Sequence, residues 1–474
     1  MIFNNSVNIL TTAELIKIYI DEFNASKERK LMIKGENYYK AENDILNRKM
    51  YRYENETAVE DETKANHKLS HGFMHEQVED KVNYLLSKPF TMTCDDEAYL
   101  KNAQDVLGKR FQNKITQLGV EASNKGIAWL HPYIDSLGKF KMIKIPSEQC
   151  IPLWADNDHE ELQTFIRFYQ VEVYEGKEKK YVTKAEWHTP DGVEYYIQDG
   201  NGQIILDAEM YLEPDGDGTL LPHFEISGVP GSWGRVPFIP FKNNGFELPD
   251  LQFIKTLVDG YDLTRSDVSN LLDEIKDIIY ALRGYGGENL SEFMRDLAYY
   301  KAVKLEDDGG IDKVEHTIDI DAAEKHYQQL RKDIYNFGQG VDKNSDKLGN
   351  SPSGIALKFI YSGLDLKCNA MEDNFKWAFE QLVYFVNMYL QITKQTVSDK
   401  EIEIVFNRDI AINESQAITD CQNSKGVISN KTIIANHPWV GDAEEEIDQI
   451  EEENKTPGDD DVLNQHKHDV EDKK

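Results

Sequence analysis

The sequence predicts an α+β protein in which long amphipathic helices accompany an antiparallel β-meander. Three observations predict this class. Helical patterns dominate residues 11–125, short alternating strands follow up to residue 242, and two helical stretches then flank a polar loop. The chain has 474 residues with 24 Tyr and 20 Phe, which is enough apolar material for two to four domains.

The first half of the chain is predicted to change from helices to strands. Helices are expected at residues 11–49, with a joint near Ser26, and at 66–87 and 98–125. Alternating apolar segments predict strands at residues 126–134, 139–145, 162–173, 180–188, 193–198 and 203–206. Thr189-Pro-Asp-Gly and Asp199-Gly-Asn-Gly are typical hairpin turns. Residues 236–242 contain two prolines, which favours an edge strand.

The second half is predicted to be mainly helical. Residues 248–276 and 321–337 carry helical patterns that fit two helices side by side, with a small α/β insert between them. The insert is expected to hold strands at 278–282, 302–306 and 312–316 and a short helix at 290–300. A strand at 401–406 and helices at 413–425 and 430–436 follow. The acidic end, from Asp442, is expected to become disordered after Lys455.

The polar loop from Gly338 to Ser353 is the most informative segment. It reads Gly-Gln-Gly-Val-Asp-Lys-Asn-Ser-Asp-Lys-Leu-Gly-Asn-Ser-Pro-Ser. We expect it to be too polar to pack, and structureless loops longer than about 12 residues are usually functional. A loop held between two helices is well placed to contact something that moves past it.

One very long helix is predicted behind the loop, from Pro352 to about Thr393. Ser351 is a suitable N-cap and Pro352 fits the first turn. Its apolar face is expected to contain Ile355, Phe359, Cys368, Met371, Phe375, Phe379, Leu382, Val386 and Leu390. At 1.5 Å per residue the helix spans roughly 60 Å. It is either a buried core helix of a large α-rich domain or a spine that packs between identical subunits.

The formal net charge of −32 argues against a protein that grips nucleic acid over a broad face. Neutralisation of phosphates supplies most of the affinity of such proteins, so they are normally basic. An acidic wall remains compatible with nucleic acid that must slide without sticking. The ordinary interpretation of the charge is solubility and repulsion between copies.

Cysteine spacing and hydropathy indicate a soluble intracellular protein that does not enter a membrane. Cys94, Cys150, Cys368 and Cys421 are far apart and form neither a zinc pattern nor a disulfide framework. The N-terminus has no basic and apolar regions typical of a signal peptide. No apolar run approaches 18 residues, and the best one, Trp377–Ile392, contains Glu380, Gln381 and Asn387.

No catalytic or cofactor motif stands out. Gly108-Lys, Gly138-Lys and Gly176-Lys are not followed by Ser or Thr, which excludes a P-loop, and there is no Gly-x-Ser-x-Gly or His-Glu-x-x-His. Gly284-Tyr-Gly-Gly lacks the last glycine of a dinucleotide loop, and Asp215-Gly-Asp-Gly-Thr lacks the closing ligands of a calcium loop. We therefore expect no cofactor. The carboxylates are so numerous that a general acid/base pair is not excluded, but none is singled out.

His67, His71 and His75 lie four residues apart and are expected on one face of a helix. Two such histidines can share a zinc ion. Because no third ligand is evident beyond Glu79, a surface or interface stripe is the preferred interpretation, and no metal site is predicted.

Five stretches together resemble the SPP1-like portal proteins of tailed bacteriophages, over nearly the whole chain. None is a catalytic signature, and their order around the helix, insert, loop and long helix makes the match specific. They are Tyr38-Tyr-Lys with Asp44-Ile-Leu-Asn-Arg, Asn66-His-Lys-Leu-Ser-His with Val78-Glu-Asp-Lys-Val-Asn-Tyr-Leu-Leu-Ser-Lys-Pro, Gly234-Arg-Val-Pro-Phe-Ile-Pro-Phe-Lys-Asn-Asn, Tyr261-Asp-Leu-Thr-Arg-Ser-Asp-Val-Ser-Asn, and Asn436-His-Pro-Trp-Val.

The resemblance implies a division of the chain into the parts of a portal subunit. It assigns a wing to residues 1–248, stem helices to 249–277 and 319–337, a clip to 278–318 and a tunnel loop to 338–353. It assigns a long helix and a strand returning to the wing to 354–410, a crown to 411–454 and an acidic tail to 455–474.

The resemblance also implies a function and partners. Such proteins are rings of twelve subunits at one capsid vertex, and they conduct double-stranded DNA during packaging and ejection. Implied partners are the terminase motor, a head–tail adaptor, and the major capsid and scaffolding proteins. The implied location of the protein is the host cytoplasm during assembly and the virion afterwards. No enzymatic activity is implied. The tunnel-loop residues expected to face DNA are Lys343, Asn344, Ser345, Asp346, Lys347 and Asn350.

Two other hypotheses remain open from the residues alone. One is an acidic intracellular hydrolase whose long loop is an active-site lid. The other is an internal capsid or scaffold-binding protein without a pore. A ring with an open centre would distinguish the conduit from both.

Overall fold

The computed structural model describes residues 10–54, 56–62, 64–211, 220–274, 279–283, 291, 310–314, 320–344, 354–408, 414–440 and 443–455. The chain divides into two compact units. The larger unit contains Met1–Asp342 and Gly363–Arg408, and the smaller unit contains Lys343–Ser362 and Asp409–Lys474.

The N-terminal helices meet at Ser26, as predicted. Helix α1 (Thr12–Ala25) begins with a capping box, in which the Thr11 side chain accepts from the backbone of Glu14 and the Glu14 carboxylate accepts in return. Ser26 ends α1 and also caps α2 (Lys27–Tyr39), because its extended backbone frees its hydroxyl to accept from the Arg29 N–H at 3.1 Å. The expected helix up to residue 49 stops ten residues early, and only a short 3₁₀ turn, η1 (Asp44–Asn47), follows.

The next predicted helices are shorter than expected. Helix α3 is Phe73–Leu86, so the prediction that it starts at residue 66 is wrong. The predicted helix 98–125 is two helices, α4 (Glu97–Leu107) and α5 (Phe111–Lys125). They separate at Gly108, whose φ of 74° belongs to a region that favours glycine.

Two antiparallel sheets form the β part of the larger unit. The smaller has the order β13-β4-β5, from Ile239–Lys242, Ile127–Ile134 and Phe140–Ile145, and the proline-containing strand lies at its edge as predicted. The larger has the order β10-β9-β8-β7-β6. Its strands are Ile204–Leu206, Val193–Gln198, Glu178–His188, Leu162–Glu175 and Cys150–Trp154, of which the last was not predicted.

Apolar side chains bury one face of the larger sheet under α1 and join the two sheets. Ile16 and Ile20 of α1 pack on Ile166 and Phe168 of β7. Between the sheets, Trp129, Phe165 and Phe238 share a second buried cluster. The Phe165 and Phe238 rings are stacked with centroids 3.9 Å apart.

Three short strand pairs also lie in this part of the described structure. They are β1 (Tyr51–Glu54) with β2 (Thr57–Glu60), β11 (Phe224–Ile226) with β12 (Val229–Gly231), and β3 (Thr91–Thr93) with β16 (Glu403–Val405). The last pair shows that the predicted strand near residues 401–406 returns to the N-terminal part of the chain.

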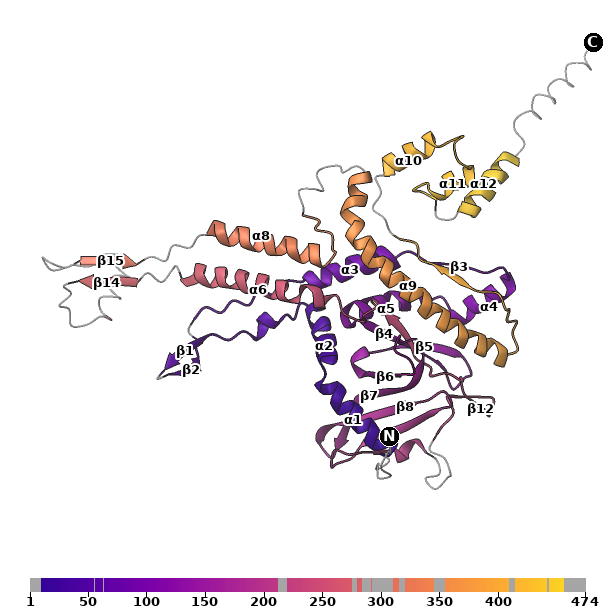
Figure 1. Ribbon diagram of the computed structural model, residues 1–474, viewed down its shortest axis with the longest axis horizontal. Coiled ribbons are helices and arrows are strands. Elements are labelled where there is room, and N and C mark those ends of the chain that lie inside the picture. The colour runs from indigo at the N-terminus through magenta and orange to yellow at the C-terminus, as the bar shows by residue number, and fades with distance from the viewer. Residues whose placement is uncertain are drawn as a thin grey trace, which may run out of the picture. The chain divides into compact units, whose positions relative to one another are not determined.

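Two helices run side by side and lead into a pair of antiparallel strands (Figure 1). The helices are α6 (Leu251–Glu274) and α8 (Ile320–Phe337), both as predicted. The strands are β14 (Ile279–Arg283) and β15 (Gly310–Val314), so the partner of the strand near residue 312 is β14. The predicted strand 302–306 lies outside the described residues, as does the short helix 290–300 except for Ser291.

Helix α9 (Gly354–Ile392) has 39 residues and confirms the predicted long helix. Cys368, Met371, Phe375, Phe379, Leu382, Val386 and Leu390 are buried on one face, as expected. Phe359, expected on the same apolar face, is 84% exposed in this single chain. Ser351 and Pro352, the predicted cap, lie outside the described residues.

Described residues of the smaller unit form three further helices near the C-terminus. They are α10 (Glu414–Asn423), α11 (Asn430–Ala435) and α12 (Ala443–Lys455). Ser429 caps α11 through its hydroxyl, and α11 packs against α12. The acidic tail after Lys455 lies outside the described residues.

Candidate functional site at the root of the polar loop

The polar loop leaves the end of α8 through two glycines that pack tightly against α3. A Cβ atom on Gly338 would lie 2.1 Å from Gln77 Oε1, and one on Gly340 would lie 3.1 Å from Gln77 Cδ. Gln77 is buried and donates from Nε2 to the carbonyl of Ile334 at 3.3 Å. A side chain at Gly338 would therefore collide with Gln77 and with the Ile334 carbonyl, whereas one at Gly340 would require Gln77 to shift slightly.

Side-chain contacts then fix the next residues of the loop. Arg331 of α8 binds Asp342 with two hydrogen bonds, from Nε at 3.2 Å and from a terminal nitrogen at 2.9 Å. The hydrogen bond to Asp342 raises the pKa of Arg331. Val341, which lies between Gly340 and Asp342 in the sequence, has only 3% of its surface exposed. The prediction that the whole loop is unpacked is therefore wrong for residues 338–342, which are packed and which we call the loop root.

The same root contacts a buried ionic cluster. Lys367 of α9 donates to the Gly338 carbonyl at 2.9 Å and also lies 3.0 Å from Asp250, the residue before α6. Lys81 of α3 lies 2.7 Å from Asp250 and 2.7 Å from the Asn243 side-chain oxygen. One carboxylate thus ties together α3, α6 and α9 at the point where the loop departs.

Burial and charge set the pKa values in this cluster. Burial lowers the pKa of Lys81 to about 8, against the attraction of Asp250. Burial alone would raise the pKa of Asp250, but the charges of Lys367 and Lys81 outweigh it and bring that pKa to about 2. Asp250 is therefore ionised at neutral pH, as a buried counter-ion between two ammonium groups must be.

An extended segment before α3 is bound along α6 in regular steps. The backbone N–H groups of His67, Leu69 and His71 donate to side chains of Asn270, Ser266 and Asp262 at 2.7, 3.0 and 3.1 Å. The donors follow one another every two residues along the extended segment, a step of about 6.6 Å, and the acceptors every four residues along α6, a step of about 6 Å. The two spacings are nearly equal, so successive contacts stay in register. This pairing explains why α3 starts after residue 72, since the N–H groups that a helix needs are already bound to α6.

The three histidines do not come together. His67 lies 2.5 Å from Asp273, His71 lies 2.6 Å from Asp262, and His75 packs on the ring of Tyr39. Within the described ranges, no group of three His, Cys, Asp or Glu residues is arranged to hold a metal ion. The expectation of a shared helical face is wrong, because His67 and His71 precede α3.

The predicted DNA-facing residues are only partly described. Lys343 and Asn344 are exposed in a turn directly after the loop root. Ser345, Asp346, Lys347 and Asn350 lie outside the described residues. Their role stays a prediction.

The residues that anchor the loop root carry only a weak signal in the sequence. Lys81 interrupts an otherwise apolar face of α3, where Met74, Val78 and Leu85 are buried. A lysine at such a position signals a buried charge that needs a partner. Its partner Asp250 is 169 residues away, and no local pattern reveals it.

Comparisons with known proteins identify the family. A family model described as phage portal protein, SPP1 Gp6-like, matches residues 16–458. The chain belongs to this portal family. The portal protein of Bacillus phage SPP1 is 32% identical over 444 residues, which cover 93% of this chain and 86% of the relative. The portal protein of Clostridium phage phiCD119 is 31% identical over 434 residues, covering 88% and 91%.

A solved structure is also similar to this portal-family chain. It is titled as the neck of a native GTA particle computed with C12 symmetry. The match has a TM-score of 0.38 and 13% identity, and it covers 77% of this chain and 91% of the other.

Family membership confirms the resemblance to portal proteins that the five sequence stretches indicate. It also confirms the α+β portal fold that this resemblance implies. Two of those stretches, Asn66–His71 and Tyr261–Asn270, are the partners in the stepwise pairing along α6. The hydrolase alternative finds no support in these comparisons. Among the described helices, none is long and apolar enough to cross a membrane.

Proposed function

We propose that the chain assembles into a ring of twelve copies at one capsid vertex and conducts double-stranded DNA during packaging and ejection. The family match over residues 16–458 carries this proposal, together with two portal proteins that align over most of the chain. The protein acts without catalysis or cofactor. It is made in the host cytoplasm and ends at the portal vertex of the virion.

The portal parts are proposed along the chain as the resemblance assigns them. Residues 1–248 form the wing, 249–277 and 319–337 the stem, and 278–318 the clip. Residues 338–353 form the tunnel loop, 354–410 the long helix and return strand, 411–454 the crown, and 455–474 the acidic tail. The paired helices α6 and α8 and the antiparallel strands β14 and β15 support the stem and clip assignments (Figure 1).

The proposed partners follow from the same parts. The clip docks the terminase motor during packaging and the head–tail adaptor afterwards. Major capsid and scaffolding proteins contact the ring during assembly. DNA in transit is the remaining partner, and an acidic wall keeps it from being held by phosphate contacts.

A first experiment tests the ring. Purified protein imaged by negative stain is expected to show rings with an open centre, and light scattering is expected to show a very large species. A monomer or small oligomer with substrate turnover would instead favour the hydrolase. A closed particle without a pore would favour the scaffold-binding alternative.

A second experiment tests the tunnel loop. The variant Lys343→Ala with Lys347→Ala is expected to form rings normally and to change the amount of DNA packaged or retained. The reason is that both ammonium groups are proposed to touch phosphates briefly as DNA passes. Unchanged DNA content in otherwise normal particles would remove the loop from the DNA path.

A further inference from the structure

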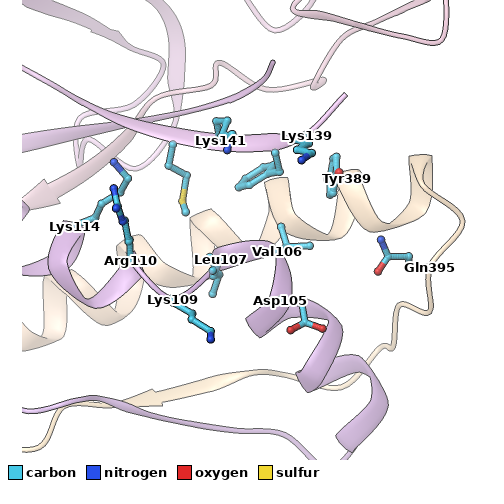
Figure 2. Close-up of a pocket in the computed structure, with 13 residues that line it drawn as sticks. Asp105, Val106, Leu107, Lys109, Arg110, Lys114, Lys139, Lys141, Tyr389 and Gln395 are labelled. Atoms are coloured by element: carbon cyan, nitrogen blue, oxygen red, sulfur yellow. The ribbon is translucent and has the colours of Figure 1, made fainter. Parts of the chain in front are cut away.

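A recess in the larger unit collects positive charge in a strongly acidic chain (Figure 2). It has a volume of about 630 Å³ and lies between the α4–α5 turn, strand β5 and the end of α9. Figure 2 shows its cations on two sides, some from the turn and α5 and the others from β5 and its approach. These cations are Lys109, Arg110, Lys114, Lys139 and Lys141. We call this recess the basic pocket.

Negative charge is scarce around the cations of the basic pocket. Asp105 is the single carboxylate in its lining, against five cationic side chains. Among the described residues, none of the five cations forms an ion pair, although lysines elsewhere in the larger unit, such as Lys125 and Lys144, do. Five like charges around one recess repel each other, so an anion from outside would relieve this repulsion.

Two further features add positive character to the basic pocket. Helix α5 starts beside it, and no side chain caps the N-terminus of this helix at Arg110. Free N–H groups and the helix dipole favour an anion at such an end. In addition, burial lowers the pKa of Lys114, which shows that the charged form of this lysine is poorly solvated.

The shape and the remaining lining favour a peptide over a nucleic-acid duplex. Val106, Leu107, Phe140, Met142 and Tyr389 give the pocket apolar walls. Pockets of roughly 300–1,000 Å³ take side chains or small ligands, whereas a duplex presents its phosphates along an open surface. A duplex would leave these apolar walls unused.

We propose that the basic pocket binds an acidic peptide segment of a partner protein, and that this segment carries an aliphatic side chain. The carboxylates contact the cations from the α4–α5 turn and from β5, and the aliphatic side chain enters between Leu107, Phe140 and Tyr389. Clusters of Lys and Arg recognise acidic motifs in this way.

The test measures anisotropy of a fluorescein-labelled synthetic peptide with four Asp or Glu residues around one Leu, titrated with the assembled protein. We expect saturable binding that weakens at least about tenfold in the variant Lys139→Glu with Lys141→Glu. Both lysines are exposed, so the variant is expected to fold. Binding should also weaken between about 0.1 M and about 0.5 M salt.

Matched controls separate the pocket from general charge. The variant Lys27→Glu with Lys101→Glu replaces two exposed lysines outside the pocket and changes the net charge as much as the pocket variant does. It should bind the peptide as the parent does. Lys139→Arg with Lys141→Arg should retain binding. The same peptide with Ser in place of Leu should bind more weakly.

Several outcomes would overturn the proposal. They are equal weakening in both glutamate variants, equal affinity for the Ser peptide, and no binding to the assembled protein. A short DNA duplex that binds more tightly than the peptide and is lost in the same pocket variant would assign the site to nucleic acid instead.

Discussion

Asp250 shows how much a single buried residue decides in this chain. Its carboxylate is 2% exposed and accepts from Lys81, Lys367 and Asn243, and its backbone N–H donates to Ser123. A buried ion pair is weak evidence for stability, but removal of one partner leaves an uncompensated charge. Asp250 is the partner shared by two ammonium groups, so its loss affects both.

We therefore expect Asp250→Asn to reduce the free energy of unfolding by about 3–5 kcal/mol, because Lys81 and Lys367 would both lose their counter-ion. Lys81→Met should cost less than half of this, since Asp250 keeps Lys367. Urea unfolding followed by circular dichroism measures both. A larger loss for Lys81→Met would show that the lysine pair is not organised around Asp250.

Three histidines, His131, His188 and His223, lie close together in the larger unit, and His188 among them is buried. The His131 and His188 rings are 5.6 Å apart, and the His188 and His223 rings are 6.3 Å apart. Burial, and then the charge of His188, lowers the pKa of His131 to about 4. The same causes lower the pKa of His223 to about 3.

These shifts predict a loss of stability in mild acid. Below the ordinary pKa of 6.5 the unfolded chain binds protons that the folded chain excludes, so the folded state loses stability as pH falls from about 6.5 towards 4. The thermal midpoint should be level above pH 6.5 and drop below it. His223→Asn should make this drop shallower, because it removes one of the groups that take up a proton on unfolding. The variant is expected to fold, since the Asn side-chain oxygen can still accept from the backbone N–H of Trp233.

His326→Asn is the matched control, since His326 is exposed on α8. Its acid profile should equal that of the parent. If His223→Asn keeps the full drop, another group, such as the nearby buried Glu186, controls the acid response.

At the scale of elements, hydrogen bonds from the segment before α3 to side chains of α6 decide where α3 starts. A helical pattern extends from residue 66, but the extended segment 66–71 forms better-satisfied contacts with α6 than it would form with itself. Tertiary hydrogen bonds at a matching repeat override local propensity here. The break at Gly108 is the converse case, because a local glycine ends a helix within a continuous apolar pattern.

The loop root predicts a further effect at this scale. Gly338→Ala would place a methyl group 2.1 Å from Gln77 and 2.7 Å from the Ile334 carbonyl. We expect a loss of about 1–3 kcal/mol in stability, together with faster tryptic cleavage at Lys343. Both follow because the contact between the α8 end and α3 must open.

Gly245→Ala is the control for this change, since nothing lies within 4 Å of its added methyl. It should leave the thermal midpoint and the cleavage rate unchanged. Equal cleavage in the Gly338 variant and the parent would mean that the root is not held by this close approach.

At the scale of the whole molecule, charge governs how copies meet. Twelve copies in the proposed ring would carry about −380 formal charges, twelve times −32. Counter-ions and local cation clusters must offset this repulsion. The basic pocket is one such cluster, and its cations lie far apart in the sequence, at residues 109–114 and 139–141, so composition alone hides it.

The sequence by itself determined the α+β class, the paired helices, the long helix α9, the meander and the family. These follow from periodicity, turn chemistry and motif order, which are local properties of the chain. Tertiary structure alone decided that residues 338–342 are packed, that α3 starts at Phe73, and that Lys81 meets Asp250. Those outcomes depend mainly on contacts between residues far apart in the sequence, such as Lys81 with Asp250, and no local pattern encodes which distant side chain satisfies a buried charge or a free N–H group.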